Sequence, residues 1–278
     1  MSAATATATL PALRRARAFS SLGTLTGRRF QLTARTPREL FVPLLTPIMF
    51  ALVIAPALKS ALHTNASYES FVAIGTVGLL IPLNTMFSGL GVIVDRENGA
   101  QRELLAAPIP RSLLVLGNLV VAFAITGLQV AVLIAVATVR GINFGPTATG
   151  VLWFVAAAGL FAIGMYGIAE ILASRVPRQE EYIARVPAIA ILPWFLAGAL
   201  FPITALPTGL TWVAKFLPLT HGLALMRYGL LGDGSGLHAI WGSGSTTGAA
   251  ALSLAVVAVF AAALTAVSIR VFTRSALQ

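Results

Sequence analysis

The chain of 278 residues is too hydrophobic and too sparsely charged for an ordinary soluble domain: 57% of its residues are hydrophobic and 10% charged. Its mean hydropathy of +0.88 is that of a protein embedded in a bilayer. The net charge of +10 suits anionic lipid headgroups better than nucleic acid, and the lack of cysteine excludes disulfides, thiolate catalysis and cysteine-ligated metals.

A basic segment, residues 1–38, precedes the first apolar stretch. On a helical projection three apolar residues and two threonines fall on one side and four of its arginines on the other. These are Phe19, Leu22, Thr26, Phe30 and Thr33 against Arg14, Arg17, Arg28 and Arg35. The pattern predicts a helix lying on the cytoplasmic leaflet, with a disordered basic tail as the alternative. The arginines that separate this segment from the apolar stretch argue against a signal peptide.

Six apolar segments are each long enough to cross a bilayer, which takes about 20 helical residues. They run over residues 40–58, 71–94, 113–139, 151–173, 182–206 and 248–271. Membrane strands would alternate with a period of two, and no such alternation is present. The sequence therefore predicts an all-α integral membrane fold in which residues 39–278 form one domain of six transmembrane helices. Pro187, Pro193 and Pro202 predict kinks in the fifth helix.

The distribution of positive charge predicts the orientation. Of the 19 lysines and arginines, all but Lys59, Arg140, Lys215 and Arg227 fall on the side that holds both termini. Positively charged loops stay on the cytoplasmic side. Both termini are therefore expected in the cytoplasm, and the arginine- and alanine-rich composition favours a bacterial cell membrane.

The densest charge between two apolar segments lies in VDRENGAQRELLAAPIPRS, residues 94–112. Asn98, followed three residues later by Gln101, matches the spacing of a capping box, and Pro108 stops a helix. The segment predicts a short helix over roughly residues 99–107, inside a cytoplasmic stretch of about 95–110. Two helical turns are not stable alone in water, so this helix must pack on something. A solvated loop that only reverses the chain is the alternative.

Two shorter apolar helices are predicted near the other face, at Leu210–Leu217 and Leu219–Leu231. Each is shorter than a span, so we interpret residues 207–232 as a re-entrant or interfacial segment on the outer side. Arg227 is expected to extend towards headgroups. The three histidines, His63, His221 and His238, are dispersed without metal-ligand spacing and are expected on the surface, with His221 a candidate helix cap.

The charged segment resembles the coupling-helix segment of ABC-2-type permeases, the membrane subunits of ATP-binding-cassette exporters. The residues that carry this resemblance are Asp95, Arg96, Glu97, Gly99, Glu103, Leu104, Leu105, Pro108 and Arg111. Residues 198–232 resemble the segment after the fifth span of the same family, through Phe201, Pro202, Pro207, Pro218, His221 and Arg227. The likeness covers nearly the whole chain and is nearest to the short permeases of the daunorubicin-resistance type.

The resemblance implies that the short charged helix fits into a groove on a separate ATPase. The coupling residues that it implies are Asp95, Arg96, Glu97, Gly99, Arg102, Glu103, Leu104 and Leu105. Internal pairing of Glu97 and Glu103 with Arg96 and Arg102 is the alternative. Family architecture implies two ATPase copies and a second permease chain, either identical or a sister.

Nucleotide chemistry is expected on the partner and not on this chain. A phosphate-binding loop needs the pattern GxxxxGK[ST], and neither Lys59 nor Lys215 follows the required glycine. ATP and Mg are therefore expected on the ATPase, with no cofactor, metal or catalytic residue in this chain. Four aromatic residues are candidates for lining an amphiphile route at a dimer interface, with anchoring at the membrane interface as the alternative. They are Trp194, Phe195, Phe201 and Trp212.

The expected substrate is amphiphilic: a drug, a lipid or a lipid-linked glycan. An ion-gradient-driven carrier of hydrophobic compounds is the alternative function. Such a carrier needs ionisable residues near the bilayer midplane, and the second, third and sixth segments have none in their interiors. Glu170 is expected near the cytoplasmic edge of the fourth. A membrane enzyme would need acids, histidines or nucleophiles clustered at one interface, and the sequence shows no such cluster.

Overall fold

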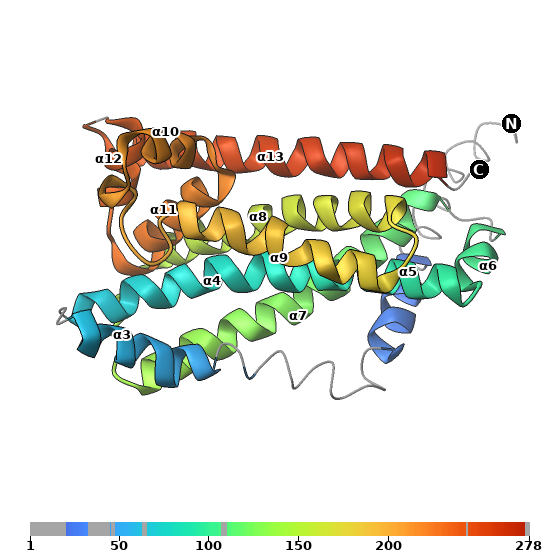
Figure 1. The fold of residues 1–278 in the computed structure, drawn as a ribbon, viewed down its shortest axis with the longest axis horizontal. Helices are drawn as coiled ribbons and strands as arrows, with labels where there is room; N and C mark the ends of the chain where they lie inside the picture. Colours follow the sequence, from blue (N-terminus) through green and yellow to red (C-terminus); the bar gives the residue numbers. More distant parts are fainter. Residues whose placement is uncertain are drawn as a thin grey trace, which may run out of the picture.

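The computed structural model describes residues 21–32, 45, 48–62, 66–106, 110–242 and 244–275. Over these residues the chain is helical apart from turns and short connections, and it contains no strand. The long helices run side by side along one axis of the molecule (Figure 1). The all-α prediction is confirmed.

Four helices in the described part of the chain are long and apolar enough to cross a membrane: Tyr68–Glu97, Ser112–Val139, Ala148–Arg175 and Thr246–Arg274. They coincide with the second, third, fourth and sixth predicted segments. The first of them consists of α4 (Ala66–Ser88) and its continuation α5 (Leu90–Glu97). The others are α7 (Arg111–Val139), α8 (Ala148–Arg175) and α13 (Thr246–Ser275).

The first and fifth predicted segments have a different form. Most of residues 40–47 lie outside the described residues, and the rest of the first segment forms η1 (Phe50–Ile54) and α3 (Ala55–Leu62). The fifth forms α9 (Gln179–Leu196), which ends well before residue 206. Gly198 follows it with a φ of 79°, which a right-handed helix cannot continue. The count of six spans stays a prediction.

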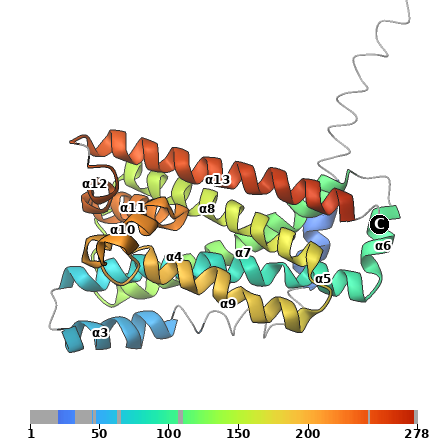
Figure 2. The same ribbon diagram turned by 45° about the horizontal axis from the view of Figure 1, so that its top comes forward.

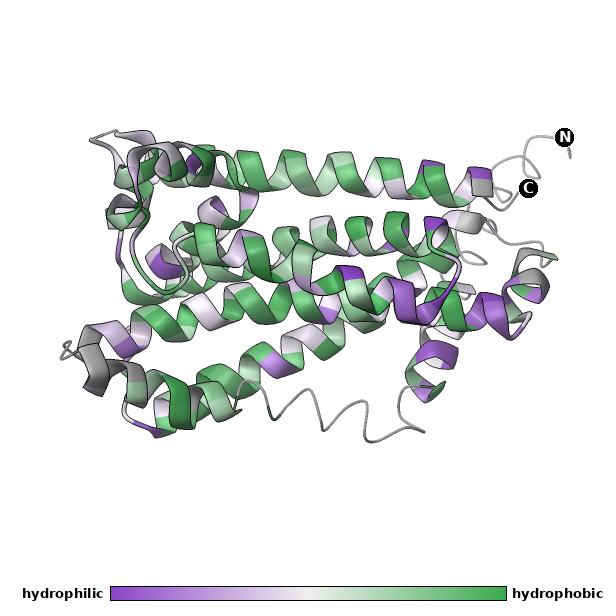
Figure 3. Ribbon diagram, viewed as in Figure 1, coloured by the Kyte–Doolittle hydropathy of each residue, from purple (hydrophilic) through white to green (hydrophobic). Residues whose placement is uncertain are grey.

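The helix of residues 21–32 and five short elements complete the described part of the fold, and the five gather at its two ends (Figure 1). They are α6 (Ala100–Ala106), η2 (Ile203–Ala205), α10 (Thr208–Phe216), α11 (Pro218–Leu231) and α12 (Ser235–Trp241). Figure 1 places α6 at one end of the bundle and α3 with α10–α12 at the other. Hydrophobic residues dominate the length between the ends, and hydrophilic residues concentrate around α5, α6 and the start of α9 (Figure 3).

Helix α8 lies at the centre and makes its most extensive contacts with α13 and α11. Glycines allow these close approaches. A Cβ on Gly150 would lie 2.1 Å from the carbonyl oxygen of Gly229 in α11, and one on Gly164 would lie 2.4 Å from the ring of Phe260 in α13. Apolar surface gives helices little reason to associate inside lipid, so small residues that bring backbones together stabilise such contacts.

Helix α11 is enclosed by the bundle, and two predictions about its polar residues are corrected. Arg227 does not extend to headgroups: it is buried, its guanidinium lies 3.4 Å from the centre of the Phe71 ring, and it donates to the carbonyl of Ala199 at 3.0 Å. His221 is not a surface residue: it is buried, with Nε2 2.9 Å from the carbonyl oxygen of Lys215. Lys215 is in the last turn of α10, so the capping role is confirmed.

The physical reason for both corrections is the same. A helix shorter than a span was expected at the periphery, but α4, α8 and α13 all pack against α11. Figure 2 shows α11 behind α10 and beside α8 and α13. His238 is only half-buried, 3.0 Å from the hydroxyl of Thr246, and His63 lies outside the described residues.

Candidate functional site

The candidate coupling site is the bend between α5 and α6, at the hydrophilic end of the bundle (Figure 3). The predicted short helix is present as α6, but Asp95, Arg96 and Glu97 belong to the last turn of α5. The predicted capping box is wrong, because Asn98 caps the C-terminus of α5, donating its backbone N–H to the carbonyl of Val94. Gly99 makes the bend with a φ of 77°, a conformation that favours glycine.

Arg96 fastens α5 to the junction between α8 and α9. Its guanidinium donates to the carbonyls of Ala173 at 3.0 Å and Pro177 at 3.2 Å, and also to that of Val176. Carbonyls at a helix C-terminus carry partial negative charge, so a cation there is favourable. Arg96 therefore does not pair with the neighbouring Glu97.

Glu97 has a partner on a different helix. The amide of Gln179, the first residue of α9, donates to the Glu97 carboxylate at 2.6 Å. This contact and those of Arg96 tie the last turn of α5 to both ends of the α8–α9 connection. The side chains of Arg102 and Leu105 lie outside the described residues, so pairing between Glu103 and Arg102 stays a prediction.

Asp95 fastens the same turn to the N-terminal helix, residues 21–32. Its carboxylate oxygens lie 3.5 Å from Arg28 and 3.3 Å from Arg29, and its side chain is only 14% exposed. Arg29 also donates to the carbonyl of Gly91 at 3.4 Å. A Cβ on Gly91 would fall 0.8 Å from a terminal nitrogen of Arg29, so a larger residue there would displace this guanidinium.

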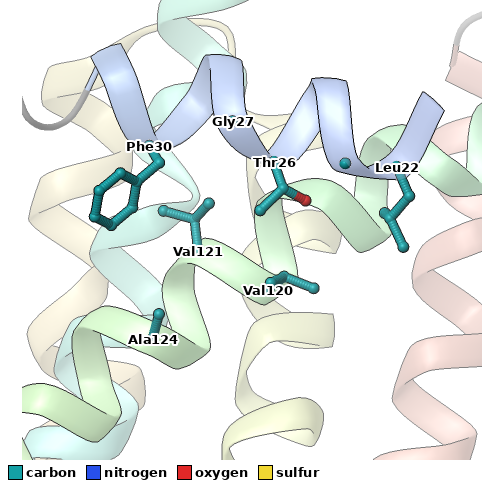
Figure 4. Close-up of a pocket in the computed structure, with 8 residues that line it drawn as sticks. Leu22, Thr26, Gly27, Phe30, Val120, Val121 and Ala124 are labelled. Carbon is teal, nitrogen blue, oxygen red and sulfur yellow. The ribbon is translucent and has the colours of Figure 1, made fainter. Parts of the chain in front are cut away.

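The apolar face of the N-terminal helix turns towards α7. Leu22, Thr26 and Phe30 line a groove of about 530 Å³, together with Val120, Val121 and Ala124 of α7 (Figure 4). Over the described residues Leu22, Thr26 and Phe30 share the side that faces this groove, while Arg28 is bound to Asp95. Phe19, Arg14, Arg17, Thr33 and Arg35 lie outside the described residues, and the placement of the helix on a leaflet stays a prediction.

Among the described side chains of helix α6, Leu104 packs against the bundle and Glu103 is an exposed acid. Leu104 is half-buried and lines a small cavity with Leu25, Leu114 and Phe272. The Glu103 side chain is exposed. The helix is thus attached by one side, and its carboxylate projects away from the bundle.

The four aromatic residues predicted to line a substrate route lie in different environments. Trp194 is buried, and its indole N–H donates to the carbonyl of Gly75 at 2.7 Å, so it packs α9 against α4. Phe195, Phe201 and Trp212 are exposed by 48%, 37% and 61%. Only the last three present an aromatic surface in this conformation.

Among the polar pairs that were not predicted from the sequence, two include a residue that is almost completely buried. Glu170 of α8 is 1% exposed and accepts a hydrogen bond from the Tyr166 hydroxyl, one turn earlier. Asn84 of α4 donates to Gln129 of α7, joining two spans. A lone polar residue inside an apolar helix is the signal that could have identified each of them, because such residues are costly unless paired.

A bundle of long apolar helices with a charged bend at one end defines a multi-pass membrane protein. The chain belongs to the ABC-2 type transporter family, whose model matches residues 20–231. This match includes the N-terminal helix, the α5–α6 bend and α11.

Individual relatives are transport proteins. The chain is 25% identical over 187 residues to a protein named as the transport permease ycf38 of Porphyra purpurea, covering 67% of this chain and 64% of that one. It is 29% identical over 143 residues to the linearmycin resistance permease protein LnrN of Bacillus subtilis (strain 168), covering 50% and 36%. It is 25% identical over 178 residues to ABC transporter G family member 20 of Dictyostelium discoideum, covering 63% and 24%. The chain thus spans less than two thirds of each of these three relatives.

Proposed function

We propose that this chain is the membrane permease subunit of an ATP-driven exporter, coupled through α6 to a separate ATPase. One observation carries the proposal: the bend that exposes Glu103 is attached through Asp95, Arg96 and Glu97 to three other helices, the N-terminal helix, α8 and α9. A surface loop that merely reverses the chain has no need of such contacts. A helix that receives force from an ATPase must be attached to the transmembrane helices that move.

The attachments suggest how force would travel. Displacement of α6 acts first on α5, which continues α4 in one span. Arg96 passes the displacement to the end of α8, Glu97 passes it to the start of α9, and Asp95 passes it to the N-terminal helix. Transmission of this kind needs stiff elements with discrete contacts between them, and helices joined by charged hydrogen bonds supply both.

The proposed partners follow the family's architecture. Two ATPase subunits would supply ATP binding, Mg and hydrolysis, and this chain would contribute no catalytic residue. A second permease chain, identical or a sister, would complete the membrane part. We place the protein in a bacterial plasma membrane with both termini in the cytoplasm, so that α6 faces the compartment that holds ATP.

The proposed substrate is an amphiphile: a drug, a lipid or a lipid-linked glycan. The exposed aromatic side chains of Phe195, Phe201 and Trp212 support this class, because aromatic rings offer apolar contact that is not specific to one compound. A relative named for resistance to linearmycin supports export of a drug. Trp194 would join such a route only after α9 moves away from α4.

An ion-gradient-driven carrier is the second candidate, and one observation favours it. Glu170 is buried within a span, and one of its carboxylate oxygens has no hydrogen-bond partner in the described part of the chain. An intramembrane acid is a candidate ion or proton site. In the exporter proposal the same residue only binds Tyr166.

Co-purification in detergent with an ATPase encoded nearby tests the proposal. Wild type is compared with a variant carrying Glu97→Arg and Glu103→Arg, and ATPase activity is measured on the assembled complex. Glu180→Arg is the matched control, because Glu180 is an exposed acid in the first turn of α9. We expect the double reversal to release the ATPase or uncouple its activity, and the control to retain both.

The opposite result favours the carrier. If no ATPase binds the wild type under mild conditions, and the isolated chain moves a hydrophobic compound down an ion gradient in proteoliposomes, the exporter proposal fails. Loss of that transport in Glu170→Gln would then identify the ion site.

A further inference from the structure

A second site lies at the far end of the bundle from α6, where η2, α11 and α12 meet the start of α4. A cavity of about 300 Å³ is lined there by residues from all four elements. This volume is at the lower end of the range of small-molecule sites, about 300–1,000 Å³. Thr204 and Ser235, both exposed, lie on its lining, so the cavity is accessible from the surface.

Two buried hydrogen-bond donors line this cavity without a partner in the described part of the chain. They are Nε of Arg227 and the hydroxyl of Thr220, on side chains that are 6% and 3% exposed. A buried polar group left unpaired is costly, and a buried guanidinium costs more. One terminal nitrogen of Arg227 already donates to the carbonyls of Ala199 and Phe71. The Nε–H and the Thr220 hydroxyl remain available, and both suit an anionic oxygen.

The same cavity also contains a negative charge. Asp233 lines it and interacts electrostatically with Arg227. One Asp233 oxygen accepts the backbone N–H of Ser235 at 2.9 Å. A ligand that carried only negative charge would be repelled by this carboxylate. A ligand that places an ammonium beside its anion would satisfy both signs.

The neighbouring surface suggests that the ligand is a lipid. Helix α10, which contacts η2, exposes Trp212, Val213 and Phe216, the last by 78%. Such an apolar face is suited to the hydrocarbon next to the headgroups. We propose that the cavity binds a zwitterionic headgroup of the phosphoethanolamine class, with its phosphate on Arg227 and Thr220 and its ammonium on Asp233. The proposal is independent of ATPase coupling.

Native mass spectrometry of the full chain, released from nanodiscs of equal phosphatidylethanolamine and phosphatidylglycerol, tests this site. Wild type should retain phosphatidylethanolamine preferentially. Thr220→Val preserves shape and removes the hydroxyl, and we expect it to reduce the amount of phosphatidylethanolamine retained about tenfold, because the phosphate loses one donor. Its folding should not suffer, because the hydroxyl has no protein partner to lose. Thr126→Val is the matched control: it removes another buried, unpartnered hydroxyl, in α7, which does not line the cavity.

A second variant tests the ammonium contact. Asp233→Asn should shift retention towards phosphatidic acid, which has the phosphate without the ammonium, in nanodiscs that contain both lipids. A parallel titration of the detergent-solubilised chain with free phosphoethanolamine separates the two sources of this chemistry. Thr220-dependent binding of the lipid alone identifies a headgroup site, and equal binding of the free compound identifies a site for a soluble ligand.

One result overturns the proposal. If wild type, Thr220→Val and Thr126→Val retain equal amounts of phosphatidylethanolamine, and free phosphoethanolamine does not bind, the cavity holds no such group and Arg227 serves only to join α11 to α4. That result would leave the co-purification with an ATPase unaffected.

Discussion

The two ends of the bundle use charge in opposite ways. At the α5–α6 end, Asp95, Arg96 and Glu97 reach outward from a helix terminus to other elements, and Glu103 remains exposed. At the α10–α12 end, the charged Arg227 is enclosed among helices and held by carbonyls and the Phe71 ring. The first arrangement joins separate elements by side chains at their ends, and the second fixes one short helix inside a core.

This difference indicates which end can move without unfolding. Contacts at the α5–α6 end can exchange partners at smaller cost, because Arg28, Glu97 and Glu103 are partly or fully open to water that competes for them. The α11 environment cannot, since moving Arg227 would leave a buried cation without its carbonyl partners. We therefore expect substitutions at the α10–α12 end to affect stability most, and substitutions at the α5–α6 end to affect coupling.

The largest effect is expected from Gly229→Leu, where α11 meets α8. A Cβ there would lie 2.5 Å from the carbonyl oxygen of Gly150 and 2.9 Å from the backbone nitrogen of Phe154. Because backbone atoms cannot move aside easily, we expect a loss of about 3 kcal/mol, or roughly 10 °C in Tm. The measurement is size-exclusion chromatography of the detergent-solubilised protein after heating. Gly127→Leu, in α7 with open space around it, should change Tm little; equal losses would contradict the close approach.

A smaller loss is expected from Arg96→Ala, at the other end. Removing three hydrogen bonds to the end of α8 and the α8–α9 connection should cost roughly 2 kcal/mol locally, since bonds from a charged group contribute more than neutral ones. Hydrogen exchange of residues 173–179 should accelerate, and transport should fall more than ATPase binding. Arg178→Ala, at an exposed position of the same junction, is the control. Unchanged exchange in Arg96→Ala would show that the junction is held by other contacts.

Asp95→Asn should have a weaker and salt-dependent effect. It removes the carboxylate charge shared by Arg28 and Arg29, so we expect about 1 kcal/mol and a few-fold faster hydrogen exchange over residues 21–32. High salt should produce part of the same change in the wild type, because it screens the pairs. If neither Asp95→Asn nor high salt changes hydrogen exchange in the N-terminal helix, packing against α7 alone holds that helix in place.

The smallest effect on stability is expected from Glu181→Gln. Glu181 and Arg185 form an exposed pair one turn apart on α9, with 3.7 Å between them. Such pairs contribute about 0.5 kcal/mol or less, so Tm should shift by no more than about 2 °C. A shift as large as that of Arg96→Ala would mean that exposed charge at this end is as important as the buried contacts.

Local pattern was enough to predict most helices. Hydropathy located the second, third, fourth and sixth segments, and the charged segment predicted α6 within one residue at each end. These features depend on residues close in sequence. Asn98 was misassigned because a polar residue at the C-cap of one helix looks, in sequence, like the N-cap of the next helix. Only the positive φ of Gly99 shows that α5 ends with Asn98 as its cap and that α6 begins after Gly99.

Contacts between distant residues could not be predicted. Arg96 and its carbonyl partners are separated by 77 to 81 positions, and carbonyls carry no side-chain signature in a sequence. Arg227 illustrates the same limit: an arginine in a short apolar helix can extend to headgroups or lie inside a bundle, and the choice depends on which helices surround it. Paired polar residues such as Asn84 and Gln129 become recognisable only when their helices are placed side by side.

Helix α8 links the two ends as one continuous rod. Its 28 residues contain no proline, in contrast to α4 and α9. At 1.5 Å per residue it is about 42 Å long, so a tilt of only about 5° would move one tip by nearly 4 Å relative to the other. Ala173, near one tip, accepts a hydrogen bond from Arg96, and Gly150, near the other, touches Gly229. The helix therefore has the geometry of a lever arm, in which a small rotation beside α6 becomes a displacement of atomic size at α11.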